Sequence, residues 1–83
     1  MGKASTHLSK KGESRLKMVA YSKIVKEKPV VWYSPIKDNK KNNEQIIEGM
    51  MKRFKENYNI NFYRTVLFFD EFSGSTQIEK INL

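Results

Sequence analysis

Cysteine is absent from this 83-residue chain, and His7 is its only histidine. Without cysteine there is no disulfide framework, no thiolate chemistry and no cysteine-based zinc site. A single histidine cannot build a multi-histidine metal site, and its position in a short polar segment does not favour a Ser-His-Asp triad. We therefore expect neither a metal site nor histidine-based catalysis.

Long apolar runs are also missing. The longest, Val66 to Phe69, has four residues, whereas a membrane-spanning helix needs roughly 20. The amino terminus carries lysines with no apolar segment behind them, which argues against a secretory signal. We therefore expect a cytoplasmic protein with no membrane partner.

Recognisable catalytic groupings are missing as well. The four glycines, at positions 2, 12, 49 and 74, are isolated, so none belongs to a phosphate-binding loop. Asp70 and Glu71 are adjacent, and on a strand their carboxylates point to opposite faces. We predict a protein that is not an enzyme, with no cofactor and no small-molecule substrate.

Positive charge is in excess, and it is unevenly distributed. The net charge is +7, and residues 1–41 hold eleven Lys or Arg against three acids, whereas residues 42–83 hold five against six. A basic front half attracts polyanionic partners such as nucleic acid or acidic protein surfaces. The same composition also fits lysines that only keep a small protein soluble.

The first fifteen residues are polar and basic, with Leu8 as their only large aliphatic residue. Such a segment cannot bury enough apolar surface to offset the entropy cost of ordering it. We predict a flexible basic arm over residues 1–15 and a single small domain over residues 16–83.

Two runs rich in β-branched and aromatic residues follow the arm. They predict strands over residues 17–26 and 30–36, joined as a hairpin, with Pro29 and Pro35 at strand ends, where a missing N–H does least harm. A helix from Ser14 to Lys26 is the competing interpretation, since Ser14 can cap it. The Val, Tyr and Ile content favours the strand.

A helix is predicted over residues 43–58, because Asn42 or Asn43 can cap it and an apolar stripe recurs at helical spacing. The stripe consists of Ile47, Met50, Met51, Phe54 and Tyr58, with Ile46 beside it. A third strand follows within residues 59–72, then a turn at Ser73-Gly74 and a short strand over residues 77–83.

These elements predict an α+β fold in the order β-β-α-β-β: a small, four-stranded, mostly antiparallel sheet with the helix packed on one face. The third strand is apolar on both sides, which places it in the centre of the sheet, with the second and fourth strands at or near the edges. Alternation puts Tyr63, Leu67 and Phe69 on the side that the helix does not cover.

Nucleic acid is the partner that the charge layout favours, because clustered lysines neutralise phosphates and aromatic rings stack on unpaired bases. Tyr21, Trp32 and Tyr33 lie close to these lysines in the sequence and could stack on unpaired bases from an open sheet face. No helix-turn-helix is visible, and Trp32 also suits the core of so small a domain. The candidate nucleic-acid-binding residues are Lys3, Lys10, Lys11 and Arg15 in the arm, Lys17, Lys23, Lys26 and Lys28 on the hairpin, the aromatic Trp32, and Lys37, Lys40 and Lys41 in the linker.

The alternative is a protein-interaction module without catalysis. Tyr63, Leu67 and Phe69 would form an exposed apolar patch that suits a homo-oligomer or a larger protein partner. Small, basic, cysteine-free chains of this type fit structural components of phages or mobile elements, or inhibitors of host enzymes.

Overall fold

The computed structural model describes residues 13–24 and 26–83. The described residues form an antiparallel sheet and one α-helix in the predicted β-β-α-β-β order, which confirms the α+β fold. The elements are β1 (Leu16–Ser22), β2 (Val30–Tyr33), α1 (Asn43–Asn57), β3 (Tyr63–Asp70) and β4 (Thr76–Asn82). Within these residues no helix is long and apolar enough to cross a membrane.

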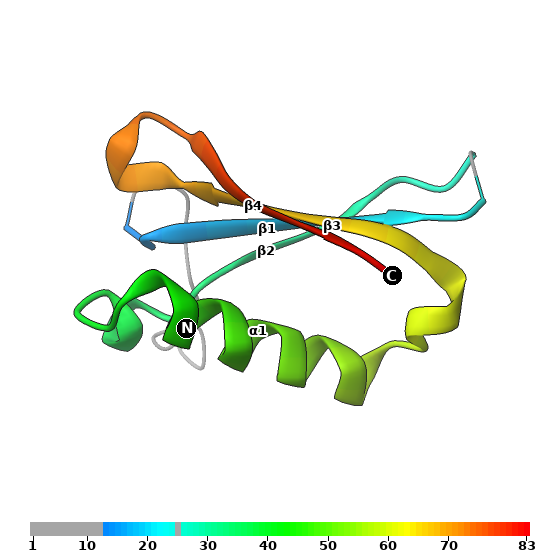
Figure 1. Cartoon of the computed structure of the whole chain (residues 1–83), viewed down its shortest axis with the longest axis horizontal. Helices are drawn as coiled ribbons and strands as arrows, with labels where there is room; N and C mark the ends of the chain where they lie inside the picture. The colour runs from blue at the N-terminus through cyan, green and yellow to red at the C-terminus, as the bar shows by residue number, and fades with distance from the viewer. Residues whose placement is uncertain (1–12, 25) are drawn as a thin grey trace, which may run out of the picture.

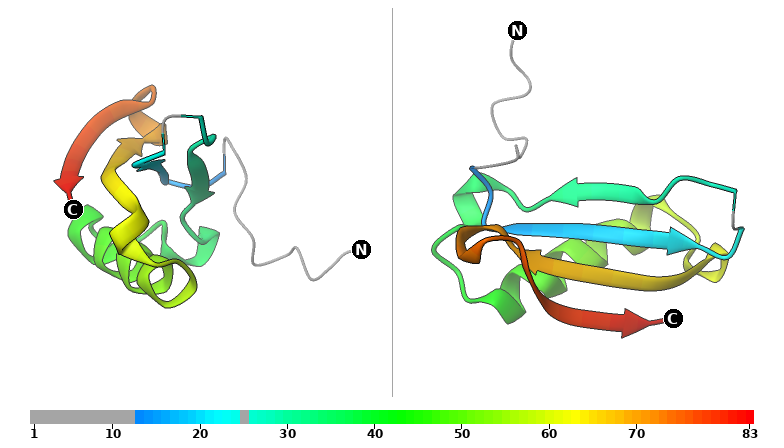
Figure 2. Two further views of the ribbon diagram at one scale, coloured as in Figure 1. Left: turned by 90° about the vertical axis from the view of Figure 1, so that its right-hand side faces the viewer. Right: turned by 90° about the horizontal axis from the view of Figure 1, so that it is seen from above.

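The strands lie in the order β2-β1-β3-β4, and each neighbouring pair is antiparallel. The prediction that the third strand is central and that the second and fourth strands are edges is therefore confirmed. Figure 2 shows the four strands side by side from above, with the helix beneath them. The helix Ser14 to Lys26, the competing interpretation, is wrong because Leu16–Ser22 pairs with both β2 and β3.

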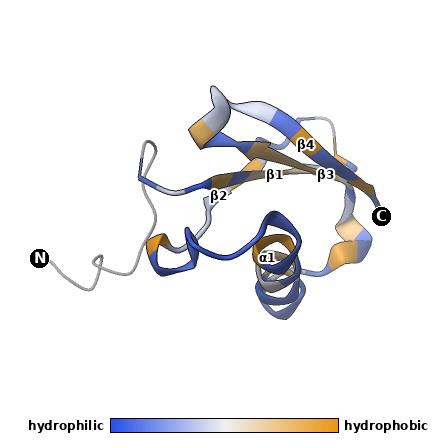
Figure 3. Ribbon diagram, turned by 60° about the vertical axis from the view of Figure 1, so that its left-hand side comes forward, coloured by the Kyte–Doolittle hydropathy of each residue, from blue (hydrophilic) through white to orange (hydrophobic). Residues whose placement is uncertain are grey.

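Helix α1 begins where the sequence predicts, because Asn42 forms a capping box with Gln45. The Asn42 Oδ1 atom accepts the backbone N–H of Gln45 at 2.8 Å, and the Gln45 side chain accepts the N–H of Asn42 at 3.4 Å. The apolar side of the helix faces the sheet and its polar side faces away (Figure 3).

The core lies between α1 and one face of the sheet. It is built from buried residues of β1, β3 and α1: Leu16, Met18, Ala20, Val66, Phe68, Ile46, Met50, Met51 and Phe54. The helix is rotated slightly from the predicted stripe, since Ile46 is fully buried whereas Ile47 is partly buried. Neither Asn57 nor Asn59 ends the helix in a left-handed conformation, because the chain leaves through extended residues.

The first hairpin has shorter strands than predicted. After Ser22 the backbone turns away from β2: the Lys23 N–H donates to the carbonyl of Phe62 at 2.9 Å, and the Ile24 N–H donates to Ser22 Oγ at 2.9 Å. Strand β2 ends at Tyr33, just before Ser34 and Pro35. The hairpin lysines beyond Ser22 therefore lie in a connection and not in a strand.

A β-bulge changes the face of Tyr63. Tyr21 pairs with Thr65, but the next residue, Ser22, pairs with Tyr63, so Arg64 is the extra residue of the bulge. An extra residue reverses the alternation beyond it. The prediction that Tyr63 lies on the uncovered side is therefore wrong: its ring packs on the helix side, 4.9 Å from that of Phe54.

Candidate nucleic-acid interface

The sheet has a second side, turned away from α1, which we call the outer face. Among the described residues no helix or strand lies over it (Figures 1 and 2). Strand alternation and register place eleven residues on it: Lys17, Val19, Tyr21, Val31, Tyr33, Thr65, Leu67, Phe69, Gln77, Lys80 and Asn82.

The centre of the outer face is aliphatic. Val31, Val19 and Leu67 lie next to one another across β2, β1 and β3. Although nothing described covers this face, Val19 is only 7% exposed, because its neighbours on the adjacent strands shield it. The centre of the outer face is therefore apolar.

Cations lie beside this apolar centre, and within the described residues they form no ion pair with a carboxylate. The Lys17 Nζ atom lies 5.3 Å from the centre of the Phe69 ring, a cation–π contact on the outer face. Lys80 lies on the same face next to Leu67. The strands carry two acids, Asp70 and Glu79, and both pair with residues that point towards the helix.

Asp70 is also engaged in a structural role. One of its carboxylate oxygens accepts the N–H of Phe72 at 3.0 Å and the other accepts the Ser73 hydroxyl at 3.3 Å. In the described part of the chain, the one ion pair joins Lys41 to the buried Asp38 at 3.2 Å, away from the outer face. The outer face is therefore positively charged.

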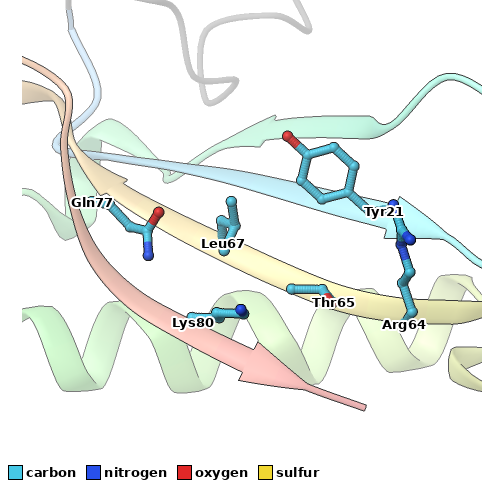
Figure 4. A pocket seen from close by; sticks show the side chains of 6 residues that line it. All are labelled: Tyr21, Arg64, Thr65, Leu67, Gln77 and Lys80. Carbon is cyan, nitrogen blue, oxygen red and sulfur yellow. The ribbon is translucent and has the colours of Figure 1, made fainter.

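A shallow, open depression runs along the outer face beside β3 and β4, from Tyr21 and Arg64 near the β1–β2 connection to Gln77, the register partner of Phe69. It has a volume of about 300 Å³ and is lined by Tyr21, Arg64, Thr65, Leu67, Gln77 and Lys80. Figure 4 shows Arg64 reaching from β3 towards Tyr21 on β1, with Gln77 and Lys80 coming from β4. The bulge that turns Tyr63 inwards thus leaves Arg64 at the rim of this depression.

Arg15, a predicted phosphate contact, holds the fold together. Its guanidinium Nη1 donates to the carbonyl oxygens of Asn39 and Lys41, each at 3.1 Å, and its backbone N–H donates to Asn39 Oδ1 at 3.0 Å. These bonds tie the start of β1 to the loop that follows β2. The guanidinium is committed to that loop, so we remove Arg15 from the interface.

The other predicted lysines fall into three groups. Lys23, Lys26 and Lys28 are exposed in the connection between β1 and β2, next to the Tyr21 end of the outer face, whereas Lys37, Lys40 and Lys41 lie near the opposite end of β1. Lys3, Lys10 and Lys11 lie outside the described residues. The structure therefore brings the hairpin lysines close to the depression and separates them from the linker lysines.

Trp32 faces the helix, contrary to its predicted role as a stacking platform. Its register partner is Met18, a core residue, and its ring contacts those of Phe54 at 5.7 Å and Tyr58 at 5.8 Å. The neighbouring Tyr33 faces outwards instead, because side chains alternate along a strand. Its partner Lys17 is on the outer face.

Of the predicted protein-interaction residues, Leu67 and Phe69 lie on the outer face as expected, and both are partly buried. Arg64 and Lys80 were missed as interface residues because they come from the less basic half of the chain. Tyr21 and Tyr33, expected from the sequence to be near the lysines, both lie on the outer face.

The described residues contain no group of three or more His, Asp or Glu side chains that could hold a metal ion. No family model matches the sequence, and the searches of curated proteins and of solved structures likewise find no match.

Proposed function

We propose that the protein binds nucleic acid through the outer face of its sheet. The observation that supports this proposal is the composition of that face: Lys17, Lys80 and the bordering Arg64 accompany three aromatic rings, and the strands place no carboxylate there. Lysine and arginine neutralise phosphates, which supplies the sequence-independent part of nucleic-acid affinity. The rings are those of Tyr21, Tyr33 and Phe69.

The hairpin connection extends this surface. Lys23, Lys26 and Lys28 follow Tyr21 along the chain and are exposed. A polyanion lying along the outer face would reach them past the Tyr21 end. The arm lysines add a further basic segment in the sequence, and deletion of residues 1–12 measures their contribution separately.

The test compares two triple variants with equal loss of charge. Lys17→Gln, Arg64→Gln and Lys80→Gln remove the cations of the outer face, whereas Lys52→Gln, Arg53→Gln and Lys55→Gln remove three exposed cations from α1. Binding to labelled oligonucleotides is measured over a range of salt concentrations.

We expect the outer-face variant to bind more weakly and to lower the slope of log K against log[salt] by about 2, at about 0.7 for each phosphate contact on a single strand. The helix variant should keep a slope close to that of the native protein. Equal weakening by the two variants would show that net charge alone drives binding. No binding by the native protein at low salt would refute the proposal.

Protein docking through the same face is the second candidate. Val31 on β2 is 46% exposed. Among the described strands β2 pairs only with β1, so the other side of this edge strand is available for pairing with another chain. The β-bulge at Arg64 weakens this candidate, because it turns Tyr63 to the helix side and so makes the apolar patch on the outer face smaller. Light scattering tests for a homo-oligomer, and a binding assay with an immobilised acidic protein tests for an acidic protein partner. Both measurements are independent of oligonucleotide binding.

A further inference from the structure

The depression on the outer face differs chemically from the rest of that face. Its floor is Leu67, one wall is the Tyr21 ring, and Arg64 and Lys80 bring positive charge from two strands. The Thr65 hydroxyl donates to Asn82 Oδ1 at 3.5 Å and can still accept a hydrogen bond, and the Gln77 amide can donate and accept. An apolar floor, a flat ring, two cations and two neutral polar groups therefore line one depression.

The volume suits one small group. About 300 Å³ lies at the low end of ligand clefts, which span roughly 300–1,000 Å³. The depression is open, so a group that enters it can remain attached to a chain that continues across the face.

Tyr21 is the ring best placed for stacking within this surface. Phe69 already has the Lys17 ammonium above it at 5.3 Å, and Trp32, Tyr58 and Tyr63 pack together with Phe54 beneath the sheet. Tyr33 lies on the edge strand β2, and of the three outer-face rings Tyr21 is the one that lines the open depression.

We propose that this depression holds one unpaired nucleotide, with its base against Tyr21 and Leu67 and its phosphate between Arg64 and Lys80. This inference rests on the proposed function. The protein then prefers single-stranded nucleic acid to a duplex, because in a duplex the faces of the bases are stacked on one another and cannot reach Tyr21. Thr65, the register partner of Tyr21, lies where its hydroxyl oxygen can accept a hydrogen bond from the edge of the bound base.

The shape of the domain also disfavours a duplex. Four strands spaced by about 4.8 Å span about 14 Å between the outer strand axes, whereas the major groove is roughly 12 Å wide. The sheet face cannot enter that groove. The exposed side of α1 mixes Glu44, Glu48 and Glu56 with Lys52, Arg53 and Lys55, which gives it no net positive charge for a groove.

The experiment measures dissociation constants for single-stranded DNA, single-stranded RNA and the matching duplex, each about 15 residues long, within the range of single-strand site sizes, in about 50 mM salt. The native protein is compared with Tyr21→Leu, which removes the flat ring, and Tyr21→Phe, which keeps it. Phe72→Leu removes a ring that is 57% exposed outside the depression and serves as the control. Urea unfolding verifies that each variant is folded.

We expect the native protein to bind at least one single strand about tenfold more tightly than the duplex. Tyr21→Leu should raise the single-strand dissociation constant about 5- to 150-fold, the effect of losing one stacked base, and change the duplex value by less than about twofold. Tyr21→Phe and Phe72→Leu should stay within about twofold of the native protein.

The outcomes separate this inference from the proposed function. Equal, salt-dependent binding to single strands and duplex would overturn the inference and leave the proposed binding through the cations of the outer face intact. Equal effects of Tyr21→Leu and Tyr21→Phe would refute the stacking contact. No binding to any oligonucleotide at low salt would refute both.

Discussion

Replacing Trp32 with alanine should cost stability, because Trp32 belongs to the aromatic cluster beneath the sheet. Its partly buried ring contacts those of Phe54 and Tyr58 at 5.7 and 5.8 Å. A tryptophan in such a site removes on the order of 150 Å² from water. At about 25 cal/mol per Å² this is worth about 4 kcal/mol, and compaction of the unfolded chain reduces it to about 3 kcal/mol.

A loss of this size is large for so small a domain. About 70 folded residues at roughly 0.05–0.15 kcal/mol each give a total stability of about 4–10 kcal/mol. Urea unfolding followed by circular dichroism should show a midpoint lowered by about 3 M, for a slope of about 1 kcal/mol per M. Trp32→Phe keeps a ring at the position and should cost less than Trp32→Ala, because it removes only part of the buried surface, so it remains measurable if Trp32→Ala does not fold.

Tyr33 provides the matched comparison, since it is the next residue of β2 and faces outwards. Tyr33→Thr keeps a β-forming side chain and should cost less than about 1 kcal/mol. Oligonucleotide binding, corrected for the folded fraction, should be unchanged in Trp32→Phe. If the Trp32 variants kept full stability and lost binding, the assignment of Trp32 to the core would be refuted.

Two further predictions concern the Tyr63 hydroxyl and the N-cap of α1 at Asn42. Burial, with smaller contributions from Tyr58 and Glu27, raises the pKa of the Tyr63 hydroxyl above 10.0. The folded state then holds this proton more tightly than the unfolded state, so the contribution to stability is complete below about pH 10 and is lost as the pH rises through the raised pKa. Urea unfolding between about pH 8 and pH 11 should therefore show a steeper loss of stability in the native protein than in Tyr63→Phe, and equal slopes would contradict this assignment. Asn42→Ala should lower the free energy of unfolding by about 1 kcal/mol because the Gln45 N–H loses its acceptor, whereas Asn42→Asp should stay within about 0.5 kcal/mol of the native value; equal losses in the two variants would exclude a capping role.

The helix and the strand order were predictable from sequence because local signals and the global fold agree. The cap at Asn42 and the apolar stripe place a helix over residues 43–58, and the observed helix is Asn43–Asn57. The two-sided apolar character of the third strand places it in the middle of the sheet, and β3 lies between β1 and β4. The spacing of apolar residues is sufficient to predict an element that covers one face of a sheet.

The start of the third strand was not predictable in the same way. Residues Ile60–Phe62 form a 3-10 turn, in which the Asn59 side chain accepts the N–H of Asn61 at 2.9 Å. Such local side-chain bonds compete with a strand. The bulge at Arg64 then reverses the alternation for Tyr63, and period-2 counting along a single strand has no means of detecting an extra residue.

The candidate interface was predictable only in part, because it combines the two halves of the chain. Lys17 comes from the basic half, but Arg64 and Lys80 come from residues 42–83, where acids outnumber bases. Pairing of β4 with β3 sorts the charges of that half by face: Lys80 points outwards, while Glu79 lies on the helix side. Charge counted along the sequence cannot register this sorting.

The bulge connects the fold to the proposed function. Strict alternation would place Arg64 beneath the sheet, where a charge without a partner is costly, and would leave Tyr63 on the outer face. With one extra residue in β3, Tyr63 instead completes the aromatic cluster with Phe54 and Tyr58, and the Arg64 side chain reaches the depression beside Tyr21. The same irregularity therefore stabilises the helix side and brings a cation to the surface that we propose for nucleic acid. For this reason we propose that the outer face is a charged binding surface and not only an apolar patch left uncovered by a single helix.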